Sequence, residues 1–177
     1  MLTYKFVLYS LFAVIFSFLI HELTHWTVGE LFGYEMRMTL NTAYPNNGNY
    51  LKNWHYTVIS AVGPLMTLIQ AIAFYFIIKK TSNKNFFPFL FTAFYIELLS
   101  GIMNYRNPND LGRIGRDLNI GLFTLPIVFV AMHYLLIYKT VKREKYDRKF
   151  ILTTFVLILI FSSIWILTKQ KYNVTLI

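Results

Sequence analysis

The sequence predicts an all-α integral membrane protein with about five transmembrane helices and a short membrane-associated β-hairpin between the first two. Three observations lead to this fold class. The chain is 56% hydrophobic and only 14% charged, whereas a soluble domain carries about 25% charged residues. Its mean hydropathy is +0.47. Apolar runs long enough to cross the ~30 Å hydrocarbon core of a bilayer recur along the chain.

Composition also narrows the chemistry. Cysteine is absent, which excludes disulfides, thiolate metal ligands and cysteine nucleophiles. The net charge is +9, and in a soluble protein this charge would suggest nucleic acid as a partner. Because the basic residues fall mostly between apolar segments, we expect them to meet the headgroups of the lipid bilayer, and we expect no nucleic-acid partner.

The first transmembrane helix is expected over residues 4–32. Its apolar part could pass for a signal peptide, but it has no small-residue cleavage site. The sequence H-E-x-x-H, from His21 to His25, follows directly instead. At 1.5 Å per residue, His21 lies about 26 Å from Tyr4 along the helix. The motif therefore belongs to the membrane side opposite the start of the helix.

A polar connection over residues 33–53 follows. Tyr34 to Leu40 alternates in the manner of a strand, and Pro45 to Gly48 is a strong turn signal. A hairpin beside the membrane and an ordinary loop both fit this pattern, so both interpretations stay open at this point.

Four further helices complete the predicted fold, over residues 54–78, 86–103, 117–138 and 150–168. Gly63 and Pro64, near the middle of the second helix, indicate a kink and a point of close packing. The third helix carries Glu97 near mid-membrane. The run from Asn104 to Arg113 after it is rich in polar residues, proline and glycine, which predicts an irregular segment.

The H-E-x-x-H motif has the residue types and the spacing of a zinc-binding helix. Successive helical residues are rotated by about 100°, so His21 and His25 lie on one face and can share a metal ion. Glu22 lies beside both and is placed to take a proton from an activated water. The alternative to a metal site is that these three residues simply form the polar end of the helix in the headgroup region. Against it, ionisable groups in a membrane helix cost about 2.5–3.5 kcal/mol each and are retained mainly where they function.

A catalytic zinc has three protein ligands, so the two histidines need a partner. Alternating crossings bring the end of the third helix to the side of the motif, which makes Asp110 the best candidate. The alternative role of Asp110 is a solvated carboxylate that caps the next helix, and Asp117 is a weaker candidate ligand. Glu30 faces away from the metal, about 140° around the helix from His25. Glu97 lies about 10 Å shallower than His21, so direct ligation needs a tilted or broken helix. Its position in the membrane also fits a group that supports a ligand or carries protons.

These features together resemble the site-2 protease family of intramembrane zinc metalloproteases. The resemblance covers residues Leu11 to Leu125 and rests on three features in the order that the family has them. The first is the motif from His21 to His25 at the end of a membrane helix. The second is Ala61 to Thr67, which is similar to the family's A-G-P stretch in the next helix. The third is Asn104 to Gly112, which is similar to the family's Asn- and Pro-rich segment that ends in Asp-Gly.

The resemblance implies that His21, His25 and Asp110 bind one Zn²⁺ and that Glu22 is the general base. The chain departs from the family pattern in two ways. Leu111 stands between Asp110 and the following glycine, and the spacing from the first asparagine to the aspartate is shorter than usual.

The resemblance also implies residues that bind the substrate or support the metal ligands. Asn104 or Asn107 corresponds to the family's asparagine near the scissile bond, and the choice between them stays open. Pro108, Gly63 and Glu97 complete this group. We expect a single transmembrane metalloprotease domain over residues 1–177, with no room for the PDZ domain of many relatives.

The expected function is hydrolysis of a peptide bond in or next to a transmembrane segment of a protein or peptide substrate. Two alternatives come from other classes of protein: a catalytically inactive adaptor with a zinc site, and a small cation transporter. Ten of the 17 lysine and arginine residues fall on the side where the chain begins. This bias places the zinc site towards the exterior, whereas the resemblance implies a site that opens to the cytosol, and the conflict stays open.

Overall fold

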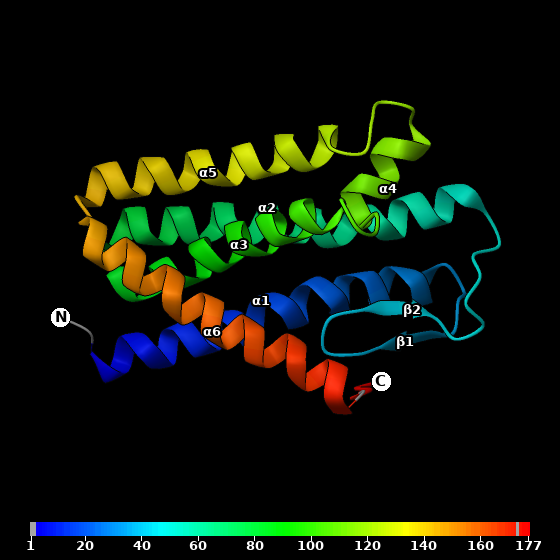
Figure 1. Ribbon diagram of the computed structural model, residues 1–177, viewed down its shortest axis with the longest axis horizontal. Helices are drawn as coiled ribbons and strands as arrows, with labels where there is room; N and C mark the ends of the chain where they lie inside the picture. The colour runs from blue at the N-terminus through cyan, green and yellow to red at the C-terminus, as the bar shows by residue number, and fades with distance from the viewer. Residues whose placement is uncertain (1–2, 173) are drawn as a thin grey trace.

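The computed structural model describes residues 3–172 and 174–177, and its course is shown in Figure 1. In chain order its elements are α1 (Tyr4–Leu31), β1 (Met36–Met38), β2 (Ala43–Pro45), α2 (Asn53–Thr81), the 3-10 helix η1 (Lys84–Phe86), α3 (Phe87–Met103), α4 (Asp110–Asp117), α5 (Thr124–Glu144) and α6 (Arg148–Tyr172). Within the described residues, five helical segments are long and apolar enough to cross a membrane: α1, α2, η1 with α3, α5 and α6. The protein is therefore a multi-pass membrane protein, and the predicted fold class is confirmed.

Successive spans run in opposite directions (Figure 1). The chain begins at one end of the bundle, and the β-hairpin, α4 and the carboxyl-terminal end lie at the other end. This arrangement carries the segment after α3 to the same end as the last turns of α1. The crossing order that was inferred from the sequence is therefore the one that brings α1 and α4 together.

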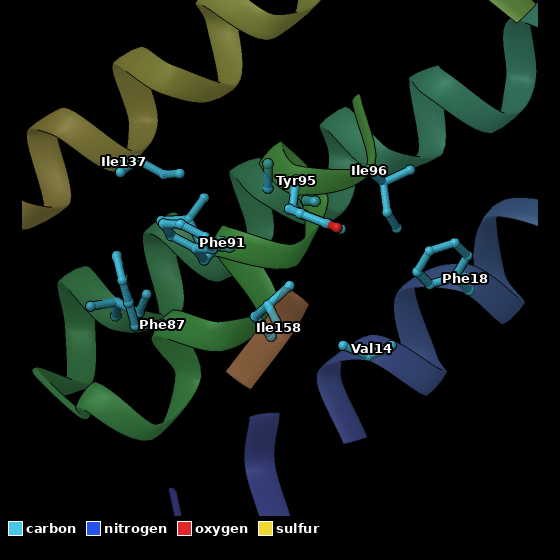
Figure 2. Packing of buried hydrophobic residues seen from close by; sticks show 12 residues of the cluster. Val14, Phe18, Phe87, Phe91, Tyr95, Ile96, Ile137 and Ile158 are labelled. Atoms are coloured by element: carbon cyan, nitrogen blue, oxygen red, sulfur yellow. The ribbon is translucent and has the colours of Figure 1, made fainter. Parts of the chain in front are cut away.

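The hydrophobic core is built around α3, which is the most buried of the five spans. Figure 2 shows Phe87 and Phe91 of α3 among apolar side chains from the neighbouring helices, including Val14 of α1, Ile137 of α5 and Ile158 of α6. Each of these five side chains is at most 7% exposed. A central helix packed on several sides fixes the positions of α1 and α2, which carry most of the polar residues described below.

Polar contacts between helices supplement this packing. The Gln70 side chain of α2 donates to Ser17 Oγ of α1 at 2.7 Å and to the Phe89 carbonyl of α3 at 3.0 Å. Burial of an amide in a membrane is costly unless it is hydrogen-bonded, so these bonds stabilise one relative placement of the three helices.

The prediction of a fourth helix over residues 117–138 is wrong at its start. The chain instead forms the short helix α4 and then the spanning helix α5, with a turn between them. In that turn Asn119 has a φ of 57° and Gly121 a φ of 98°, and such values end a right-handed helix. Apolar residues alternate with these turn residues, so a prediction from composition alone places the start of the span too early.

The connection after α1 forms the predicted hairpin, and the alternative of an irregular loop is excluded. β1 and β2 are antiparallel, with Met36 opposite Pro45 and Met38 opposite Ala43. Glu30 at the end of α1 accepts the Met36 amide at 2.8 Å through its carboxylate. Glu30 points away from the motif histidines, and its carboxylate instead fixes the start of the hairpin.

The carboxyl-terminal part of the chain covers the outer edge of β1. The Met38 amide donates to the Ile177 carbonyl at 3.0 Å, and the Leu176 amide donates to the Met38 carbonyl at 2.8 Å. Trp165 of α6 donates its indole N–H to the Leu40 carbonyl at 2.8 Å. Among the residues described, β2 therefore has the open edge of the sheet.

Candidate metal centre

Three predicted ligand residues converge at the end of α1. Asp110 Oδ2 lies 3.5 Å from His21 Nε2 and 3.4 Å from His25 Nε2, and the two Nε2 atoms are 3.1 Å apart. All three donor atoms lie within 4.8 Å of one another. His21 and His25 come from α1 and Asp110 from the start of α4, so the structure brings together the trio that crossing order predicted.

These distances suit a tetrahedral zinc site. Two donor atoms that each lie about 2.0–2.1 Å from a tetrahedral ion are about 3.3 Å apart, and the observed separations of 3.1, 3.4 and 3.5 Å bracket that value. Two imidazoles and a carboxylate are also an established donor set for zinc. The geometry therefore fits the metal that the motif implies.

Hydrogen bonds set the tautomer of His25. Its Nδ1 lies against the carbonyl oxygen of Ile59 in α2, and a carbonyl can only accept. Nδ1 therefore donates its proton to this carbonyl, and Nε2 is the ring nitrogen that faces Asp110 and could bind a metal. The hydrogen bond from Nδ1 to Ile59 also fixes the orientation of the ring, and histidine ligands are usually supported in this way.

The same logic holds for His21, through a residue that the sequence analysis did not single out. His21 Nδ1 lies 2.8 Å from Thr67 Oγ1. The Thr67 hydroxyl donates its own proton to the Gly63 carbonyl at 3.0 Å, so its oxygen accepts from His21 Nδ1–H. Both histidines thus turn their Nε2 atoms towards Asp110.

Asp110 is held by α4 and by Arg113. It lies in the first turn of α4, where the partial positive charge of the helix end favours a carboxylate. Its second oxygen, Oδ1, accepts from Arg113 Nη2 at 2.9 Å, while Arg113 packs over the Tyr56 ring at 5.3 Å. Burial alone would raise the pKa of Asp110, but the imidazoles of His25 and His21 hold that pKa well below its usual range.

Gly63 leaves room for both imidazoles. A Cβ atom at this position would come within 2.7 Å of His21 Nε2 and closer still to His25 Nε2, and such contacts require the rings to move. Pro64 follows it inside α2 and lacks the amide that would bond to the Ser60 carbonyl. The Gly-Pro pair therefore lets α2 approach α1 at the level of the metal ligands.

The segment before α4 is shaped by Asn104. This residue is 2% exposed, and its side-chain oxygen accepts the Asn109 amide at 2.6 Å. A Cβ at Gly112 would lie 2.6 Å from Asn104 Cγ, so the glycine two residues after Asp110 is needed for this packing. Asn104 thereby positions the loop that presents Asp110.

The other residues of that segment have different surroundings. Asn107 is exposed and Pro108 is partly buried, and neither lines the cavity beside the metal ligands. Asn109, which the sequence analysis did not single out, does line it. Its side-chain amide donates to the Ser100 carbonyl at 3.2 Å.

A cavity of about 410 Å³ opens beside the three ligands. Its wall includes Glu22 and His25 of α1, Asp110 and Arg113 of α4, and the hairpin from Asn41 to Pro45. Tyr50, Tyr56 and Ser60 supply further polar groups to the wall. Burial raises the pKa of Tyr50 to about 12, so its phenol remains a hydrogen-bond donor at neutral pH. Glu22 itself is only 7% exposed.

Glu97 is not one of the converging ligands. It is 2% exposed on α3, and its carboxyl group lies beside the Thr67 hydroxyl that supports His21. One of its oxygens, Oε1, has no hydrogen-bond partner among the described residues. Asp117, the weaker candidate ligand, lies at the far end of α4 beside Arg116.

The three residues of the candidate metal site could be found from the sequence, whereas the contacts of Thr67 and Arg113 could not. Thr67 follows Gly63 by four residues and Arg113 follows Asp110 by three, so helical spacing places each on the same face as a predicted site residue. Comparison with known protein families, with curated proteins and with solved structures finds no match to this chain.

Proposed function

We propose that this protein is an intramembrane zinc metalloprotease that hydrolyses a peptide bond in or next to a membrane-spanning segment. One observation carries the proposal: a donor atom from each of His21, His25 and Asp110 converges on one point, with Glu22 in the wall of the adjoining cavity. A zinc held there supplies a Lewis acid that polarises a carbonyl and lowers the pKa of a water from about 15.7 towards about 7.

Glu22 is assigned the proton transfers. As a carboxylate in a buried wall, it accepts a proton from the attacking water and then donates that proton to the leaving amine nitrogen. Asp110 cannot take this role, because both of its oxygens are engaged, one by Arg113 and the other by the histidines.

The substrate strand is proposed to lie along β2. A substrate can add to an exposed edge of a sheet as a further strand. The outer edge of β1 is occupied by Leu176 and Ile177, which leaves the edge of β2. The hairpin bonds Thr39–Thr42 and Glu35–Asn46 fix the alternation, so the backbones of Ala43 and Pro45 face away from β1. These residues line the cavity with Glu22. A membrane-spanning substrate must unwind locally to pair there, because its helix hides its own backbone.

The test uses purified protein in liposomes with synthetic single-span peptides that carry glycine, proline or asparagine near the middle. The Glu22→Gln variant is expected to bind zinc like the wild type and to cleave none of the peptides that the wild type cleaves. Mass spectrometry of the products gives the cleavage sites, and metal analysis gives the zinc content. Equal cleavage by the variant would overturn the proposal.

The same liposomes separate the proposal from the two alternatives. A wild type that binds zinc but cleaves no peptide favours an inactive adaptor. Zinc flux across the bilayer without cleavage favours a cation transporter. Cleavage that is lost on chelation and returns with zinc supports the protease.

A further inference from the structure

A second cavity, of about 440 Å³, lies at the end of the bundle opposite the metal centre. Its lining comes from the start of α1, from η1, from the connection between α5 and α6, and from the start of α6. Figure 1 shows that these ends lie together, away from the hairpin and α4. Because they are ends of membrane spans, the cavity lies at the depth of the lipid headgroups.

Positive charge is concentrated around this cavity. Lys84, Lys145 and Lys149 line it, and Asp147 is the one acidic residue in its lining. One oxygen of the Asp147 carboxylate accepts the Phe150 amide at 2.7 Å at the start of α6, so three lysines stand against one carboxylate. None of the three lysines forms an ion pair within the part of the chain that the structure describes. Three lysines without an ion pair therefore border one cavity, where an anion would be stabilised.

Tyr146 adds a donor with no acceptor. Its hydroxyl is buried and has no hydrogen-bond partner among the described residues, although its side chain lines the cavity. The ring is fixed between Phe87 at 5.1 Å and Phe150 at 4.6 Å. Burial raises the pKa of Tyr146 to about 12, so the hydroxyl stays protonated. A buried hydroxyl without a partner is costly, and an oxygen of a bound anion would satisfy it.

The remaining walls are apolar. Phe6 and Phe150 line the cavity with their rings 5.2 Å apart, and both belong to spanning helices whose outer faces meet lipid tails. A ligand with a charged head and an apolar body matches both parts of the lining, whereas a free inorganic anion matches only the lysines and Tyr146.

We propose that this cavity binds the phosphate headgroup of an anionic phospholipid from the leaflet at the amino-terminal end of α1. The ammonium groups of Lys84, Lys145 and Lys149 neutralise the phosphate, and Tyr146 donates a hydrogen bond to one of its oxygens. The site is independent of the metal centre and of any proteolysis.

The experiment compares the full-length protein with two triple variants that remove the same charge. The site variant is Lys84→Gln, Lys145→Asn and Lys149→Gln; asparagine is chosen at 145 because Lys145 has a left-handed φ of 54°, which asparagine tolerates. The control variant carries Lys79→Gln, Lys80→Gln and Lys139→Gln, exposed residues at the same end that do not line the cavity. Each protein is titrated with phosphatidylglycerol, phosphatidylcholine or inorganic phosphate. Bound lipid is counted by native mass spectrometry, and the melting temperature is measured in parallel.

The wild type and the control variant are expected to retain phosphatidylglycerol and to melt at a higher temperature with it, but not with phosphatidylcholine. The site variant is expected to bind phosphatidylglycerol about tenfold more weakly or worse, since each lysine near a membrane surface contributes appreciably. Its melting temperature in phosphatidylcholine alone shows that it is folded. The proposal is overturned if both variants lose the lipid equally, or if neither does. An equal rise in melting temperature with inorganic phosphate would overturn the assignment to a lipid.

Discussion

Thr67 on α2 accepts a hydrogen bond from His21 on α1, with 2.8 Å between Thr67 Oγ1 and His21 Nδ1. The hydroxyl proton is committed to the Gly63 carbonyl one turn earlier, so the contact has one direction only. It fixes both the proton and the plane of the imidazole. A side chain in the neighbouring helix thereby determines whether the H-E-x-x-H motif can bind a metal through Nε2.

The Thr67→Val variant is therefore expected to bind zinc about 10- to 100-fold more weakly, which is the usual effect of removing the support of a histidine ligand. Valine keeps the shape of the side chain and removes only the hydroxyl. Competition with a zinc-binding dye measures the affinity. Thr67→Ser keeps the hydroxyl and should bind like the wild type. Wild-type affinity in the valine variant would show that Thr67 does not orient His21.

A substitution at Gly63 tests whether the close approach of α2 to His21 and His25 is needed for zinc binding. Gly63→Ala places a methyl group within 2.7 Å of His21 Nε2, so the rings must rotate out of position. The zinc content is expected to fall from about one ion per chain to near zero, as metal analysis would record. Gly101→Ala is the matched control, because a Cβ there lies 3.5 Å from its nearest neighbour, Pro126 Cβ, an ordinary contact. Zinc loss in the control alone, or in neither variant, would contradict this account of Gly63.

Much of the fold follows from the sequence because membrane spans are set by length and hydropathy. Crossing order then places Asp110 on the side of His21 and His25, which is a geometric consequence of alternating spans. The start of the fourth span could not be predicted in the same way. It depends on the left-handed backbone at Asn119 and Gly121, and apolar neighbours obscure that turn in the sequence.

The contacts around the candidate metal site could not be predicted from the sequence for a different reason. The contact between Thr67 and His21 depends on how far α2 is shifted along α1, which Gly63 and the packing against α3 decide together. The occupied edge of β1 depends on Ile177, which is 139 residues away from Met38 in the chain. Sequence patterns report periodicity within one segment, and these contacts join separate segments.

A substitution at Arg113 tests whether the hydrogen bond to Asp110 Oδ1 is needed to orient the carboxylate for zinc binding. Arg113→Gln removes the bond from Nη2 to Oδ1, which is 2.9 Å long, and frees the carboxylate to rotate away from the histidines. A roughly tenfold loss of zinc affinity is expected, measured by the same dye competition. Arg116→Gln removes an equal charge from the same helix, at a residue whose ion pair is with Asp117 at the far end of α4. If the two variants lose affinity equally, the effect is one of charge and not of Asp110 orientation.

Trp165 tests whether α6 holds the hairpin beside the cavity. Trp165→Phe keeps an aromatic ring against Phe18 but removes the N–H that bonds to the Leu40 carbonyl at 2.8 Å. Such a bond contributes about 1 kcal/mol, so amides of the hairpin are expected to exchange about fivefold faster with deuterium. Zinc affinity should not change, because the bond that is removed joins α6 to the hairpin and not to a candidate metal ligand.

Trp54→Phe is the matched control for that exchange measurement. Trp54 is 55% exposed and packs on Phe32 and His55, so its loss should leave the exchange of Met38 and Thr39 amides unchanged.

For the proposed protease, the loosened β2 edge in Trp165→Phe should raise the KM for a membrane-spanning peptide more than it lowers kcat, because the edge binds substrate and Glu22 stays in place. Unchanged hairpin exchange in Trp165→Phe would mean that Leu176 and Ile177 hold the sheet without help from α6.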